Sequence, residues 1–106
     1  MNGSVVEHVV PVQVPRLAGT RAAADLLVDP IASELQDAVV RVFGQNLIDA
    51  SPSFSDQLLQ RLISAGAQSI VVFSSPDDFV GQLEASAEAS KFRQLRRATE
   101  DEEYSV

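Results

Sequence analysis

The stretch from Ala38 to Gly66 constrains the fold most, because it combines the patterns of a buried strand, a turn and an amphipathic helix. The run AVVRVF (38–43) is short, apolar and rich in β-branched residues, which favours a buried strand over a helix. After the turn, Ser51 and Pro52 are residue types that begin helices, since serine caps a free amide and proline tolerates the first position. We therefore predict a strand–turn–helix unit whose helix begins after this serine and stops at Gly66.

Within the predicted helix, apolar residues recur at helical spacing and form one face that would pack against a sheet. The members of this face are Phe54, Leu58, Leu59, Leu62 and Ile63. Ser53 and Asp56 have the S-x-x-D spacing of a second capping box, which overlaps the cap at Ser51. Two serine hydroxyls are therefore expected at one helix N-terminus, shortly after a strand.

The residues before this unit predict further elements. Residues 4–14 are rich in valine but contain Pro11, which cannot donate to a sheet, so we predict an edge strand or two short strands bent at the proline. Thr20–Val28 is a helical pattern capped by its first residue. A proline divides it from a second short helix, Pro30–Gln36, for which Asp29 is the expected cap.

The second half of the chain repeats the alternation. Ser69–Phe73 is another buried-strand run, and Ser75 and Pro76 repeat the signal for a capped helix. The apolar side of that helix fades toward a basic cluster, which we expect at the helix end, where cations suit the dipole. The cluster consists of Lys91, Arg93, Arg96 and Arg97.

This order of elements predicts an α/β fold, a small mixed sheet with mostly parallel strands backed by helices. A chain of 106 residues is long enough for one core, so we predict one domain, residues 1–98, followed by an acidic, disordered tail, residues 99–106. The predicted core combines strand residues with the inner helix faces. Its members are Val40, Val42, Phe54, Leu58, Leu62, Ile70, Val72, Phe79 and Leu83.

The composition disfavours several classes of function. The formal charge of −7 argues against a nucleic-acid binder, because phosphate contacts need a basic surface. The absence of cysteine removes thiol catalysis and disulfides. No run has the length of a membrane span, and the start of the chain lacks the basic and apolar regions of a signal peptide. We therefore expect a cytoplasmic protein with neither membrane nor nucleic acid as a partner.

Few residues could support catalysis. His8 is the only histidine and has no cysteine or second histidine to share a metal, so we expect an ordinary strand residue. Ser51 lacks the surroundings of a nucleophile elbow, and the carboxylates Asp49 and Asp56 near it have positions typical of helix caps. The sequence therefore predicts no enzymatic activity, no metal site and no cofactor.

The segment LIDASPSFSDQLLQRL (47–62) resembles the central motif of STAS and STAS-like domains, in which a strand ends in an Asp-Ser-Ser type turn before an amphipathic helix. SFSDQ (53–57) is similar to the start of that helix in the uncharacterised STAS-like branch, and LAGTRA (17–22) is similar to its first-helix entry. The resemblance extends over residues 16–97. It implies a small sheet backed by helices, with the loop before the central helix at one end.

The resemblance also implies a function. In anti-sigma factor antagonists of the STAS family, the second serine of the turn accepts phosphate from a partner kinase. Here Asp49 matches the aspartate, Ala50 replaces the first serine, Ser51 lies at the acceptor position and Pro52 replaces a glycine. We therefore expect a non-enzymatic interaction module with a histidine-kinase-like ATPase or another regulator as its partner. The candidate switch residues are Asp49, Ser51, Ser53 and Asp56.

Three alternatives stay open at this point. Ser51 and Ser53 could be plain helix caps without a regulatory role. The same loop could instead bind a small ligand or a nucleotide, or the chain could be a structural subunit of a larger assembly.

Overall fold

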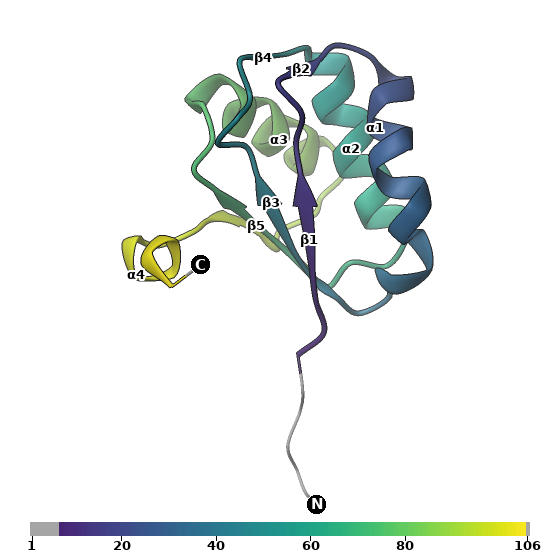
Figure 1. Ribbon diagram of the computed structural model, residues 1–106. Coiled ribbons are helices and arrows are strands. Elements are labelled where there is room, and N and C mark those ends of the chain that lie inside the picture. The colour runs from purple at the N-terminus through teal and green to yellow at the C-terminus, as the bar shows by residue number, and fades with distance from the viewer. Residues whose placement is uncertain (1–6, 106) are drawn as a thin grey trace, which may run out of the picture.

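The computed structural model describes residues 7–105, and its centre is a four-stranded parallel sheet with the strand order β1-β3-β5-β6 (Figure 1). The α/β class with parallel neighbouring strands is confirmed, and within the described residues the sheet contains no antiparallel strand. The four strands are β1 (Val9–Gln13), β3 (Val39–Phe43), β5 (Ser69–Phe73) and β6 (Leu95–Arg97).

Three helices cover one face of this sheet, whereas no layer of helices from the described part of the chain covers the opposite face (Figure 1). Each strand-to-strand step advances in the same direction across the sheet, so right-handed crossovers bring every connecting helix to the same side. The covering helices are α1 (Arg21–Val28), α2 (Pro52–Ser64) and α3 (Asp77–Ala89). A short 3-10 helix, η1 (Asp29–Glu34), extends α1.

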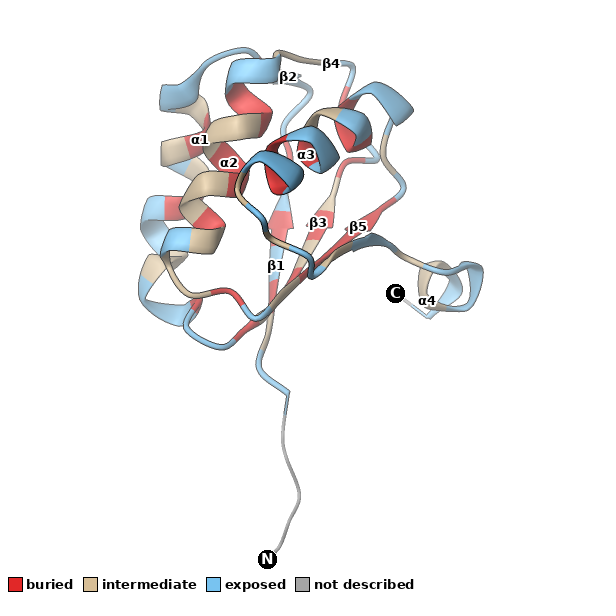
Figure 2. Cartoon of the chain, turned by 180° about the vertical axis from the view of Figure 1, so that it is seen from behind, coloured by how far each residue is buried: buried red, intermediate tan, exposed pale blue. Residues whose placement is uncertain are grey.

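The core lies between the sheet and these helices, and its predicted composition is confirmed. All nine predicted core residues are buried, each no more than 3% exposed. Along β1, β3 and β5, alternate side chains such as Val12, Val42 and Val72 enter this core. Figure 2 shows the matching pattern on the helices, whose buried residues face the sheet.

Strand β1 forms one edge of the sheet, as the position of Pro11 predicts. His8 O accepts from Val39 N, and Val14 N donates to Phe43 O, so the even-numbered residues point their backbone groups at β3. The N–H group that Pro11 lacks would therefore point away from the sheet, and the strand continues through the proline without a break. The predicted residues 4–6 lie outside the described part of the chain.

Helix α1 ends before Pro30, as predicted, but the second short helix is of a different type from α1. Thr20 caps α1 by accepting from Ala23 N at 3.0 Å. The following segment is a 3-10 helix that begins at Asp29, one residue before Pro30. Asp29 was expected to cap it, but makes no capping hydrogen bond, because its carboxylate instead binds Arg61 at 2.6 Å.

Both long helices end in the same capping motif, and only one of the two endings has a clear sequence signal. After α2, Ala67 N donates to Leu62 O while Gly66 takes a φ of 95°, as the predicted glycine stop requires. After α3, Phe92 N donates to Ala87 O while Lys91 takes a φ of 58°. A lysine seldom adopts this conformation, so the end of α3 was not predicted.

The end of the chain differs from its prediction in two ways. Residues 95–97 are not a helix end but strand β6, with Ala98 N donating to Val72 O at 2.9 Å. Residues 100–104 are not disordered but form helix α4 (Glu100–Tyr104), with a capping box between Thr99 and Glu102. Contacts with other parts of the chain hold both elements: β6 pairs with β5, and the ion pair between Arg96 and Glu102 connects α4 to β6. Such contacts between separate elements leave no periodic pattern in the sequence, so neither element could be predicted from helical spacing.

Lowering the pH is expected to release α4 from β6. The guanidinium of Arg96, and then the backbone N–H of Thr99, lower the pKa of Glu102 from 4.5 to about 2. Because the folded state has the lower pKa, the contacts of Glu102 stabilise the docked helix fully above about pH 4.5 and are lost as the pH falls through 2. A ¹³C NMR titration of the Glu102 carboxyl carbon should therefore show a midpoint near pH 2.

The control for this titration is the Arg96→Gln variant, which keeps the length of the side chain but removes its charge. Its Glu102 midpoint should move up toward the ordinary value. An identical midpoint in the two proteins would show that the ion pair does not form in solution.

Candidate interaction surface

The predicted turn Asp49–Ser53 lies at the carboxyl end of the main sheet, but it is more ordered than a simple turn. Asp49–Ala50 forms strand β4, which pairs in parallel with strand β2 (Leu17–Ala18). This two-stranded sheet is separate from the main one (Figure 1). Its two-residue strands are too short to produce an alternating pattern, so neither could be predicted from the sequence.

Ser51 is the N-cap of α2, and both hydrogen-bonding capacities of its hydroxyl are used. The Oγ accepts from Phe54 N at 3.0 Å and donates to Gly19 O at 2.9 Å. The first bond is the predicted cap, and the second ties the start of α2 to the loop before α1. Ser51 is half-buried, and its backbone N–H also donates to Ala18 O. This residue therefore joins the start of α2 to the segment Ala18–Gly19 before α1.

Ser53 and Asp49 have exposed side chains on the two sides of Ser51. Within the described residues, neither side chain takes part in a hydrogen bond or an ion pair. Ser53 lies in the first turn of α2, and the predicted capping box between Ser53 and Asp56 does not form, because the N-cap position belongs to Ser51. Both side chains are therefore accessible to another molecule.

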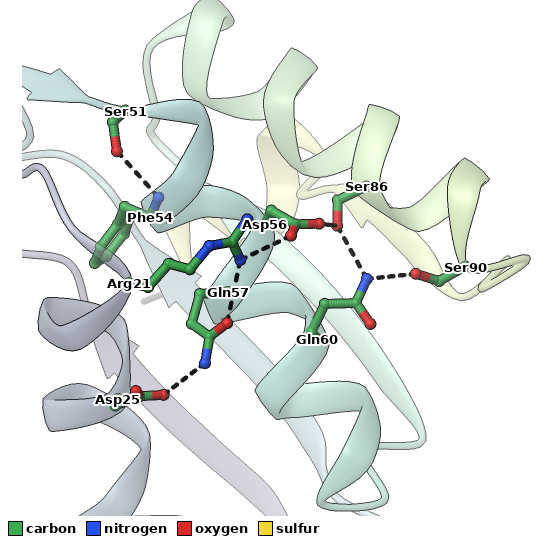
Figure 3. Close-up of polar contacts among 9 residues, drawn as sticks. All are labelled: Arg21, Asp25, Ser51, Phe54, Asp56, Gln57, Gln60, Ser86 and Ser90. Carbon is green, nitrogen blue, oxygen red and sulfur yellow. Dashed lines mark hydrogen bonds and ion pairs between the residues drawn. The ribbon is translucent and has the colours of Figure 1, made fainter.

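Asp56 does not belong to the turn but to a polar network on the outside of the helices. It accepts from Arg21 Nη1 of α1 at 2.9 Å and from Ser86 Oγ of α3 at 2.6 Å (Figure 3). The hydrogen bond from Ser86, followed by that from Arg21, lowers the pKa of Asp56. The carboxylate thus connects the three helices, and its expected role at the switch surface has no geometric support.

The same network continues along α1 and α2. Asp25 accepts from Gln57 Nε2 at 2.9 Å and from Arg61 Nη1 at 2.7 Å, and these two bonds lower its pKa, the bond from Gln57 contributing most. On the other side, Gln60 Nε2 bonds the hydroxyls of Ser86 and Ser90 (Figure 3). These contacts fix the helices relative to one another, and so fix the direction in which α2 presents its first turn.

A cleft of about 550 Å³ lies beside the turn, between residues 47–50 and the first turns of α3. Gln82 of α3 lines the cleft and connects its two walls. Its Nε2 donates to Ala50 O at 3.2 Å, and its Oε1 accepts from the buried Ser55 hydroxyl at 2.6 Å. Asp49, Asp77 and Asp78 line the cleft, which gives it a negative character. No local sequence pattern predicts this cleft, because its two walls are far apart along the chain.

The start of α3 on this cleft differs from its prediction. Ser75 was expected to cap the helix, but its hydroxyl donates to Phe73 O at 2.8 Å instead. The N-cap is Pro76, which has no side chain that could accept a hydrogen bond. The acidic side chains of Asp77 and Asp78 occupy the first turn, where the helix dipole favours them.

Two large apolar side chains are exposed beside the turn. Leu17 of β2 is 71% exposed and Ile48, directly before β4, is 63% exposed. Ile48 N donates to Arg16 O at 2.8 Å, which brings the two segments together. Nothing in the sequence distinguishes these residues from core positions, since both belong to apolar patterns.

Other expected properties of the chain concern metals and membranes. His8 is exposed, next to the start of β1. Residues 7–105 contain no group of three or more side chains placed to hold a metal ion. In the same part of the chain, no helix combines the length and the apolar character that crossing a membrane requires.

Comparison of the chain with family models, with curated proteins and with solved structures found no match.

Proposed function

We propose that this protein is a non-enzymatic regulatory module of STAS-like type, and that it binds a protein partner through the surface around Asp49, Ser51 and Ser53. The observation that carries the proposal is the exposure of Leu17 and Ile48 beside this turn. Exposed apolar side chains rimmed by polar groups are typical of protein interaction sites. The accessible carboxylate of Asp49 and hydroxyl of Ser53 provide such polar groups.

Phosphorylation of Ser51 would act as a switch on this surface. A phosphate on the Oγ can still accept from Phe54 N, and the helix dipole favours its negative charge. It cannot donate to Gly19 O, however, and its charge would repel that carbonyl. The loop before α1 would therefore separate from the start of α2, and the positions of Leu17 and Ile48 would change together. A histidine-kinase-like ATPase in the cytoplasm is the partner that the STAS resemblance suggests.

Two variants of Ser51 separate a switch from a plain cap. Ser51→Asp should keep most of the stability, because aspartate also caps helices well, yet change the affinity for the partner by about 1–3 kcal/mol. Ser51→Ala also lacks the bond to Gly19 O, but it adds no charge that repels this carbonyl. It should therefore lose about 1 kcal/mol of stability with the cap and keep the binding of the unphosphorylated form. Isothermal titration calorimetry and urea unfolding measure the two quantities.

A switch and a plain cap predict different results for the Ser51→Asp and Ser51→Ala variants. If both variants bind the partner like the wild type and only the alanine variant is less stable, Ser51 is a cap and the switch hypothesis fails at this residue.

A small-ligand site is the second candidate, and the cleft between residues 47–50 and α3 favours it. The carboxylates of Asp49, Asp77 and Asp78 would repel the phosphates of a nucleotide, so a small cation is the better ligand class. NMR titration with ATP and with a polyamine tests this candidate. Shifts at Gln82 and Ala85 with the polyamine alone would favour it over the interaction module.

A further inference from the structure

The face of the sheet opposite α1–α3 carries a second cluster of apolar side chains outside the main core. We call it the open sheet face. Val71 and Phe73 of β5 are at most 4% exposed, yet neither belongs to the core beneath the helices. The rings of Phe43 and Phe73 stack with their centroids 4.8 Å apart. The open sheet face is formed by Val9, Pro11, Gln13, Val39, Arg41, Phe43, Ser69, Val71, Phe73 and Arg96, which alternate with the core residues of their strands.

Arg41 lies in the middle of this face, and it has no charged partner among residues 7–105. Its guanidinium is 5.7 Å from the centre of the Phe73 ring, and the residue is half-buried. The paired arginines of the described chain bind carboxylates at 2.6–3.0 Å. One of them is Arg96, which lies in the same row of the sheet as Arg41, two strands away, and binds Glu102. A half-buried cation beside aromatic rings interacts more strongly with an added carboxylate than an exposed one, because water screens it less.

Helix α4 carries groups complementary to this face, and it stands away from the body of the protein on the side without helices (Figure 1). Two of its carboxylates hold it in place: Glu102 binds Arg96, and Glu103 accepts from the N–H and hydroxyl of Ser74 at 2.8 and 2.6 Å. The other charged side chains of the helix, Glu100 and Asp101, are exposed. Tyr104, at the end of α4, is 88% exposed.

We propose that the open sheet face is a homodimer interface, in which α4 of each copy lies on the open sheet face of the other. A groove of about 550 Å³ lies between Pro11, Arg41, Phe43 and Glu103 of one copy. It receives Tyr104 of the second copy, while Glu100 and Asp101 of that copy approach Arg41. The arrangement is isologous, so each chain supplies one groove and one acidic helix. The contact leaves the Asp49–Ser53 turn free, since that turn lies at the carboxyl end of the sheet.

Sedimentation equilibrium of the full chain, from about 1 µM to 1 mM, tests this proposal. The wild type should show a concentration-dependent monomer–dimer equilibrium. Tyr104→Ser and Arg41→Glu should each weaken the dimer by on the order of tenfold or more. Leu26→Ser and Arg93→Glu are matched controls, because both residues are exposed and neither belongs to the open sheet face or to α4. They should dimerise like the wild type.

A charge exchange makes the test specific for the pairing of Arg41 with α4. A chain with Arg41→Glu and a chain with Asp101→Lys should each associate weakly alone, and should form a heterodimer when mixed. A wild type that stays monomeric at 1 mM would overturn the proposal, as would a dimer equally strong in Tyr104→Ser and in the controls. Should Arg41→Glu fail to fold by circular dichroism, Tyr104→Ser alone decides, since its side chain is almost fully exposed.

Discussion

Leu58→Ala is expected to lower the free energy of unfolding by about 2–5 kcal/mol, the range for a large-to-small substitution in a packed core. Leu58 is 0% exposed and lies in the middle of α2, which packs on both α1 and α3. The polar network between the three helices holds them in place, so they cannot close around the missing atoms without breaking bonds such as that from Ser86 to Asp56. Urea unfolding followed by circular dichroism measures the loss.

Leu26→Ala is the matched control for this measurement, because the same side chain is 74% exposed on α1. It should change the stability by no more than about 0.5 kcal/mol. Equal unfolding midpoints for the Leu58→Ala variant and the wild type would show that the inner face of α2 has been assigned wrongly.

Gly44→Ala is expected to cost about 1–3 kcal/mol through overpacking. A Cβ at this position would lie 3.0 Å from Ser75 Cβ and 3.4 Å from its Cα, and closer still to its hydroxyl. The hydroxyl cannot turn away freely, since it donates to Phe73 O, and Gly44 N donates to the same carbonyl. The substitution therefore pushes apart the two loops at the carboxyl ends of β3 and β5, one of which leads to the candidate turn.

Gly81→Ala provides a control with the opposite sign. Gly81 lies on the exposed side of α3, and an added Cβ would meet nothing within 4 Å. Because alanine has the higher helix propensity, this variant should gain about 0.5–1 kcal/mol. Thermal unfolding of the two variants decides: if Gly44→Ala were as stable as Gly81→Ala, the close approach of the two loops would be refuted.

The sequence was sufficient to predict the α/β class and the main core, because both depend on periodicity. The helix face with Phe54, Leu58 and Leu62 and the apolar runs of β3 and β5 carry strong patterns over several residues. The caps of α1 and α2 were predictable for a related reason. Thr20 and Ser51 act on residues three positions away, so local sequence contains the whole interaction.

Elements held by distant residues could not be predicted in this way. Strand β6 has only three residues, two of them arginines, and it forms because β5 offers it an edge. Helix α4 is five residues long and depends on Arg96 and Ser74, which lie outside it. Because four of its five residues are acidic, the segment has no apolar face whose periodicity could indicate a helix.

The same difference between local and distant interactions applies to the candidate site. The sequence was sufficient to identify Ser51 as a cap, but not its second bond to Gly19 O, which connects positions 32 residues apart. Asp56 was assigned to the turn because it follows Ser53 at capping distance, whereas its partners Arg21 and Ser86 come from two other helices. The exposure of Ile48 and the cleft beside it depend on the packing of β4 against α3, which no local pattern encodes.

The affinity of the Ile48→Ser variant for the partner is the sharpest test of the proposed interaction surface. The partner is first isolated by pull-down with the tagged protein from its native host, identified by mass spectrometry and purified. Isothermal titration calorimetry then compares Ile48→Ser with Leu26→Ser, which removes an equally exposed apolar side chain on α1. Ile48→Ser is expected to weaken binding by on the order of tenfold to a hundredfold, whereas Leu26→Ser should bind like the wild type. Wild-type affinity in both variants would contradict a partner surface at the β4–α2 turn.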